Sequence, residues 1–130
     1  MKEDNMGFLS AVFGNASEVS AEDVLEKYAL LLTAGEEIIK VCKLFRDVYI
    51  FTDKRLILID KQGVSGKKTE YLTIPYRSIS RFSVETAGHF DLDAELKIWI
   101  SSAAEPAVVK TFSKSVNIYE IQRILAKYVL

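Results

Sequence analysis

Residues 47–68 read DVYIFTDKRLILIDKQGVSGKK, and this stretch decides the fold of the chain. Its two apolar runs, residues 48–52 and 55–60, are separated only by Asp53 and Lys54. A two-residue connection between such runs predicts an antiparallel hairpin, because parallel neighbours need a long crossover. The second run is apolar at both odd and even positions, so we expect a helix or another chain to cover each of its faces.

Composition limits the class of protein. The chain has 130 residues, 49% of them hydrophobic and 27% charged, which predicts one globular domain with a single core. A formal net charge of −1 argues against a general nucleic-acid binder. The single cysteine excludes an internal disulfide. We recognise no signal peptide and no run near the roughly 20 apolar residues of a membrane span, so we expect a cytoplasmic protein.

Further strands are expected on both sides of the hairpin. Short apolar or alternating runs separated by turn residues predict about seven strands in meander order. Pro75 cannot donate a ladder hydrogen bond, so it should lie at a strand end, at an edge or in a bulge. The expected strands besides the hairpin are residues 36–45, 69–76, 78–86, 94–101 and 107–113.

Helices are predicted at both ends of this β region. Ser20 and Asp23 are typical of a helix start, and Gly35 is typical of a helix end. Asn117 and Glu120 form a capping box before an amphipathic C-terminal helix. The predicted fold class is mainly β, a bent antiparallel sheet or partly open barrel with a C-terminal helix. Residues 1–35 would form a helical extension and residues 36–130 the β domain, as one structural domain overall.

Three blocks of sequence carry a family resemblance. They are YIFTDKRLILIDKQGVSGKK, EYLTIPYRSISRFSVETAG and FDLDAELKIWI. In this order they resemble the bacterial pleckstrin-homology-like domain family over residues 36–130. The resemblance implies the same β fold and self-association into ring-like homo-oligomers. It implies no particular activity, because one fold hosts many functions.

Catalysis has little support in the sequence. Cys42 falls inside an expected strand, where a cysteine is usually a small buried hydrophobe, and His89 is the only histidine. A nucleophilic pair of these two would need a third, orienting group that no motif indicates. Walker, G-x-S-x-G and dinucleotide motifs are absent from the sequence. We therefore predict a protein that is not an enzyme and has no cofactor.

Calcium binding is also disfavoured. Asp91, Asp93 and Glu95 begin like an EF-hand loop. The sixth position is Leu96 instead of glycine and the twelfth is Ser102 instead of glutamate, so we expect a solvated turn and no metal site.

Basic residues give a weak candidate for anion binding. Lys61, Lys67 and Lys68 flank a turn with two glycines, whose backbone amides could assist them. Exposed lysines that keep strand edges soluble are the alternative. Lys40 and Lys43 should point to opposite faces of their strand, so they do not converge as in lipid-binding pleckstrin-homology domains.

Candidate contact residues lie near the N-terminus and on the sixth expected strand. The apolar face Phe8, Leu9, Val12 and Phe13 could dock on its own domain, on a membrane surface or on another copy. Membrane insertion is not favoured, because interfacial helices usually carry basic residues on their polar face. Trp99 should point outward, either as an interface anchor or beneath a terminal helix.

The sequence is compatible with two functions. The first is a non-enzymatic binding and assembly module that forms a homo-oligomer. The alternative is peripheral binding of anionic lipid or phosphate headgroups at the inner membrane surface.

Overall fold

A computed structural model of the chain describes residues 26–44, 46–62, 68–86 and 93–130. These residues contain seven strands in two antiparallel sheets, neither of which closes into a barrel, and a C-terminal helix. The predicted fold class and strand number are thereby confirmed. The chain divides into two compact units, residues 1–73 and 74–130, which are described separately.

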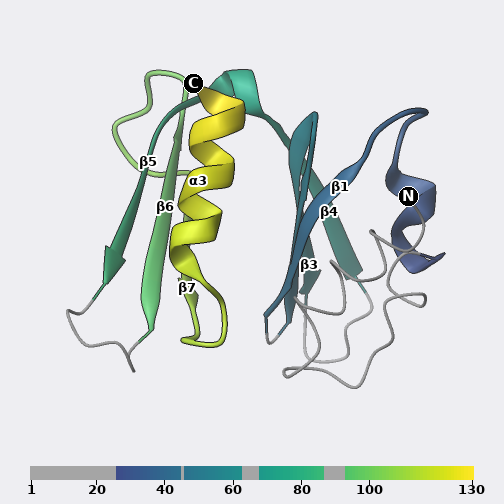
Figure 1. The fold of residues 1–130 in the computed structure, drawn as a ribbon, viewed down its shortest axis with the longest axis horizontal. Coiled ribbons are helices and arrows are strands. Elements are labelled where there is room, and N and C mark those ends of the chain that lie inside the picture. Colours follow the sequence, from purple (N-terminus) through teal and green to yellow (C-terminus); the bar gives the residue numbers. More distant parts are fainter. Residues whose placement is uncertain (1–25, 45, 63–67, 87–92) are drawn as a thin grey trace. The chain divides into compact units, whose positions relative to one another are not determined.

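The first unit is built on a four-stranded sheet (Figure 1). Its strands follow one another in sequence order as β1 (Ile38–Lys43), β2 (Asp47–Thr52), β3 (Arg55–Gln62) and β4 (Lys68–Pro75), the last of which runs on into the second unit. The predicted hairpin is β2–β3, in which Ile50 lies opposite Ile57 and Tyr49 opposite Leu58. Its turn consists of Asp53 and Lys54, as predicted, and Pro75 ends β4.

One face of this sheet is covered by the helical segment before it. Residues 26–28 are helical and continue into the 3-10 helix η1 (Ala29–Leu31). The side chains that bury this face are Tyr28, Val41, Val48, Ile50, Ile57 and Ile59, with Leu31, Leu32 and Ile38 packed against them. On the other face Phe51 and Leu56 are also fully buried. The expectation that residues 55–60 are covered is confirmed for the face under the helical segment.

Gly35 differs in detail from its predicted role. The helical segment ends at Leu31, and Gly35 lies four residues later in a turn, with a positive φ of 79°. The turn is closed by a hydrogen bond of 3.1 Å from the Glu36 amide to the Thr33 carbonyl. Glycine suits this position because the left-handed region costs it no steric clash. The expected helix start at Ser20 and Asp23 lies outside the described residues.

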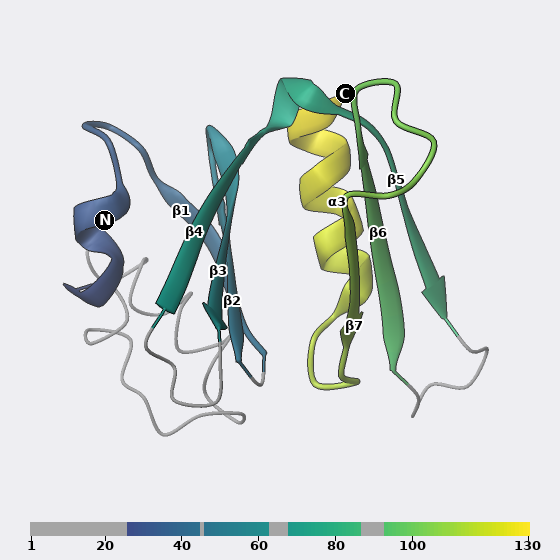
Figure 2. The ribbon, with the colours of Figure 1, turned by 180° about the vertical axis from the view of Figure 1, so that it is seen from behind.

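The second unit pairs a three-stranded sheet with the C-terminal helix. Its elements are η2 (Tyr76–Ser78), β5 (Ile79–Thr86), β6 (Ala94–Ile100), β7 (Val108–Phe112) and α3 (Ile118–Val129), with sheet order β5-β6-β7. In both views α3 runs alongside these strands (Figure 1 and Figure 2). Asn117 caps α3 as predicted, because its side chain accepts hydrogen bonds from the amides of Tyr119 and Glu120.

Alternation along β6 separates two faces of the second sheet. Leu96 and Ile98 are fully buried, as are Ile121 and Leu125 of α3. Glu95, Lys97 and Trp99 occupy the opposite, partly exposed face. This is the pattern that the sequence predicts for a strand with one face in a core.

Candidate functional site

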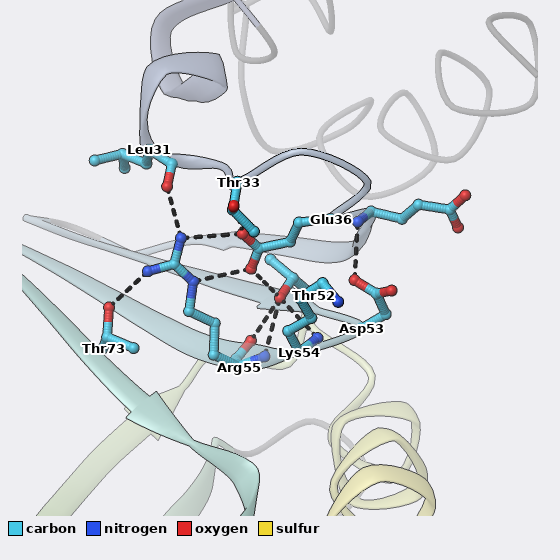
Figure 3. Close-up of polar contacts among 9 residues, drawn as sticks. Leu31, Thr33, Glu36, Thr52, Asp53, Lys54, Arg55 and Thr73 are labelled. Carbon is cyan, nitrogen blue, oxygen red and sulfur yellow. Dashed lines mark hydrogen bonds and ion pairs between the residues drawn. The ribbon is translucent and has the colours of Figure 1, made fainter.

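A buried carboxylate, Glu36, lies in the first unit beside the turn between β2 and β3 (Figure 3). Its side chain is completely buried, and Arg55 donates to both oxygens, from Nε to Oε2 at 2.9 Å and from Nη2 to Oε1 at 3.0 Å. The Thr52 hydroxyl donates to Oε2 at 2.6 Å and the Thr33 amide to Oε1 at 3.0 Å. These four donors compensate for the water that a buried carboxylate loses.

Arg55 also ties three segments of the first unit together. Its Nη2 donates to the Leu31 carbonyl at 2.6 Å, and its Nη1 donates to the Thr73 hydroxyl at 2.9 Å (Figure 3). One guanidinium therefore joins the helical segment, β3 and β4. We call this set the Glu36–Arg55 clamp; it comprises Leu31, Thr33, Glu36, Thr52, Arg55 and Thr73.

The clamp changes the acidity of Glu36. Hydrogen bonds from Arg55, and less strongly those from Thr52 and Thr33, lower the pKa of Glu36 from 4.5 to about 2, against the opposing effect of burial. The folded-state pKa therefore lies below the unfolded-state value. The carboxylate contributes its full stabilisation above about pH 4.5, and that contribution is lost as the pH falls towards 2.

We expect this linkage to appear in denaturant unfolding measured between pH 6 and pH 2. The wild-type free energy of unfolding should fall by about 3 kcal/mol through Glu36 alone, since one pKa unit corresponds to about 1.4 kcal/mol. Glu36→Gln should remove this component, whereas the exposed-site control Glu105→Gln should retain it. Equal pH slopes for Glu36→Gln and the wild type would contradict the assignment.

Three lysines converge at the other end of the first sheet. Lys43 ends β1 and lies opposite Val48, which in turn lies opposite Ile59 of β3. Lys61 follows Ile59 by two residues, so it extends from the same face of the sheet. Lys27 comes from the helical segment, next to Tyr28, which belongs to the same buried cluster as Val48 and Ile59. The lysine cluster of Lys27, Lys43 and Lys61 thus combines three segments that are distant in sequence.

The positive charges in this cluster act on one another. Partial loss of hydration, followed by the nearby ammonium groups of Lys61 and then Lys43, lowers the pKa of Lys27. All three lysines are exposed. The ion pairs of Arg55 with Glu36 and of Lys97 with Glu95 do not involve the cluster.

The structure describes two of the three lysines that were predicted to bind an anion. Lys61 lies in the lysine cluster, Lys68 is exposed as the first residue of β4, and Lys67 lies outside the described residues. Sequence reasoning did not select Lys27, which only the packing of Tyr28 brings to the sheet. The prediction that Lys40 and Lys43 point to opposite faces is confirmed, because Lys40 lies opposite Phe51 and Lys43 opposite Val48, and these two residues of β2 lie on opposite faces.

Trp99 contacts two other residues of the second unit. The Arg81 guanidinium lies 4.5 Å from the centre of the indole ring, and the indole Nε1 donates to the Ala104 carbonyl at 3.3 Å. These contacts pin the connection between β6 and β7 on the partly exposed face. A role for Trp99 in an interface remains a prediction. The other predicted contact residues, Phe8, Leu9, Val12 and Phe13, lie outside the described residues.

The candidate residues for catalysis and metal binding lie partly outside the described part of the chain. Cys42 is buried in β1, and His89 lies outside the described residues. Asp91 is likewise not described, while Glu95 pairs with Lys97 at 3.5 Å. The described residues include no group of three or more histidine, cysteine or acidic side chains that could hold a metal ion.

In the described ranges, every helix is too short or too polar to cross a bilayer.

Similar proteins place this chain in a family. Residues 7–129 match the bacterial PH (pleckstrin homology) domain family. Uncharacterized protein YjqA of Bacillus subtilis is 60% identical over 121 residues, which cover 93% of this chain and 97% of YjqA.

Two crystal structures from Shewanella extend the likeness to the fold. A pleckstrin homology domain from Shewanella amazonensis is 50% identical with a TM-score of 0.72, covering 95% of this chain and 99% of that one. A DUF1696 family protein with a pleckstrin-homology domain, from Shewanella loihica, is 43% identical with a TM-score of 0.77, covering 88% and 97%. The chain therefore belongs to the bacterial PH domain family.

Proposed function

We propose that this protein is a non-enzymatic assembly module of the cytoplasm that associates with further copies of itself. The observation that supports this most is β4, the last strand of its sheet in the described part of the chain. Tyr71 and Leu72 in its middle are 54% and 42% exposed. Adjacent strand residues point to opposite faces, so apolar surface is exposed on both sides of one edge.

An edge of this kind favours pairing with another chain. Unpaired strand edges present free amides and carbonyls, and natural proteins usually protect them with charges, proline or a covering element. In β4 such protection lies at the ends, with Lys68 and Glu70 at the start and Pro75 at the finish. Pairing of this edge with a different edge of a second copy is heterologous and gives a ring if the rotation closes.

Light scattering at micromolar concentration tests the proposal. The wild-type chain should have a mass that is a multiple of the monomer mass. Tyr71→Lys/Leu72→Glu should scatter as a monomer, because it places charges on both faces of the edge. The matched control makes the same two changes at Tyr119 and Leu30, which are 60% and 96% exposed, and should keep the wild-type mass. A monomeric wild type would rule out self-association.

A second candidate function is binding of anionic lipid or phosphate headgroups at the inner membrane surface. The observation that favours it is the lysine cluster, in which Lys61 lies beside two other ammonium groups. This possibility is independent of the β4 edge.

A further inference from the structure

We propose that β4 of one copy pairs antiparallel with β7 of a second copy, with Tyr71 opposite Val109 and Glu70 opposite Lys110. This pairing depends on the proposed self-association and identifies which edge receives β4. It would join the first sheet of one molecule to the second sheet of the next.

Two of the outer strands expose large apolar side chains. In the described part of the chain, β1 and β4 are the outer strands of the first sheet, and β5 and β7 are those of the second. The large apolar side chains that these strands expose are Tyr71 and Leu72 of β4 and Val109 of β7, which is 50% exposed. The exposed residues of β5 are all polar or charged, and on β1 only Lys43 is exposed. The edge that matches β4 in apolar character is therefore β7.

The two edges also match face by face. On β7, Val108 is buried and Val109 is exposed, because neighbouring strand residues point to opposite faces. Tyr71 and Leu72 likewise point to opposite faces of β4. With Tyr71 opposite Val109, Leu72 lies opposite Val108. Each exposed apolar side chain of β4 would then meet an apolar side chain on its own side of the joined sheet.

The same register brings suitable partners together at two further positions. Glu70 lies opposite Lys110, and Thr69 lies opposite Thr111. Opposite charges, pairs of threonines and aromatic residues facing β-branched ones are among the cross-strand pairs that stabilise antiparallel sheets. Four consecutive positions of β4 thus have suitable partners on β7.

Alternative registers lose these matches. Any shift separates Glu70 from Lys110, and a shift of two residues places Leu72 opposite either Lys110 or Pro106. Parallel pairing with the same central pair would also set Leu72 beside Lys110. Pairing of two β4 edges around Tyr71 would set Glu70 opposite Leu72. A contact between unlike edges, β4 with β7, therefore fits the residues better than a contact between like edges.

Disulfide trapping tests the register in the full chain. Directly opposite residues of an antiparallel pair have Cα atoms about 4.5–5.5 Å apart, a separation that a disulfide can span. Thr69→Cys/Thr111→Cys should therefore give covalent dimers and higher multimers after mild oxidation, seen on a non-reducing gel. The matched control Thr69→Cys/Ser113→Cys should lose this product, because diagonal neighbours are about 7–8 Å apart. The native thiol Cys42 is 1% exposed and is present in both variants.

Charge reversal provides a second test that introduces no thiol. Glu70→Lys and Lys110→Glu should each raise the dissociation constant of self-association by about two- to thirtyfold, because an attractive cross-strand pair becomes a repulsive one. Mixing the two variants should restore association, since each altered strand then faces an opposite charge. The control changes Glu105→Lys and Lys114→Glu, at exposed positions outside the strands, should leave the constant within about twofold.

Light scattering of the wild type separates this pairing from self-association itself. Multimers trapped through positions 69 and 111 but not through 69 and 113, with rescue on mixing of the charge variants, support the pairing. If the wild type is oligomeric but positions 69 and 111 link no better than the control, or link within one chain, the pairing is wrong and self-association still stands. A monomeric wild type would overturn both.

Discussion

Replacing Arg55 with alanine is expected to lower the free energy of unfolding by about 3–5 kcal/mol, as is typical when one partner of a buried ion pair is removed. The Glu36 side chain is completely buried, and its charge would lose two of its four donors. The Leu31 carbonyl and the Thr73 hydroxyl would lose a hydrogen-bond partner too. Urea unfolding at pH 7 measures the change.

Two further variants make this result specific. Arg77 is exposed, and Arg77→Ala should alter the free energy of unfolding by no more than about 0.5 kcal/mol. The double variant Glu36→Gln/Arg55→Ala removes both charges, so it should be destabilised by less than the sum of its two single changes. Strict additivity in this cycle would mean that the two groups are not coupled.

Replacing Tyr28 with alanine should cost a similar amount, about 3–5 kcal/mol, as for other large aromatic side chains in a core. Tyr28 is 6% exposed and packs on the face formed by Val48, Ile50 and their neighbours. Its removal leaves a cavity and weakens the attachment of the helical segment to the sheet. Urea unfolding at pH 7 measures the change.

The neighbouring residue provides the control for this change. Leu30 lies in the same segment but is 96% exposed, so Leu30→Ala should change stability by no more than about 0.5 kcal/mol. Similar losses for the two variants would show that the segment does not act through Tyr28.

The strands and turns were predictable because their signals are local. Asp53 and Lys54 separate two apolar runs, Pro75 ends a strand, and Asn117 begins a helix; each does so through its own backbone chemistry. The apolar character of β3 also predicted the cover that the helical segment provides on one of its faces. Family resemblance and local signals therefore gave the same fold class.

The polar sites depend on packing between distant residues. Glu36 and Arg55 are separated by 19 positions, and their contact follows from the β1–β2–β3 register together with the turn at Gly35. In the sequence Arg55 is simply one basic residue beside a turn. Lys27 carries even less signal, because exposed lysines are common on helices and its neighbours belong to two strands. The sequence selected Lys61 as a candidate for anion binding but not its neighbour Lys27.

The clamp has a consequence for anyone who wishes to shorten this protein. A chain that begins at Glu36 keeps all seven strands and α3, and it would look like a complete domain on paper. It would lack the Leu31 carbonyl, the Thr33 amide and the Tyr28 ring, so Arg55 and the face around Ile50 would lose their cover. The residues before the sheet are thus an integral layer of the first unit, and a trimmed expression clone should start upstream of them.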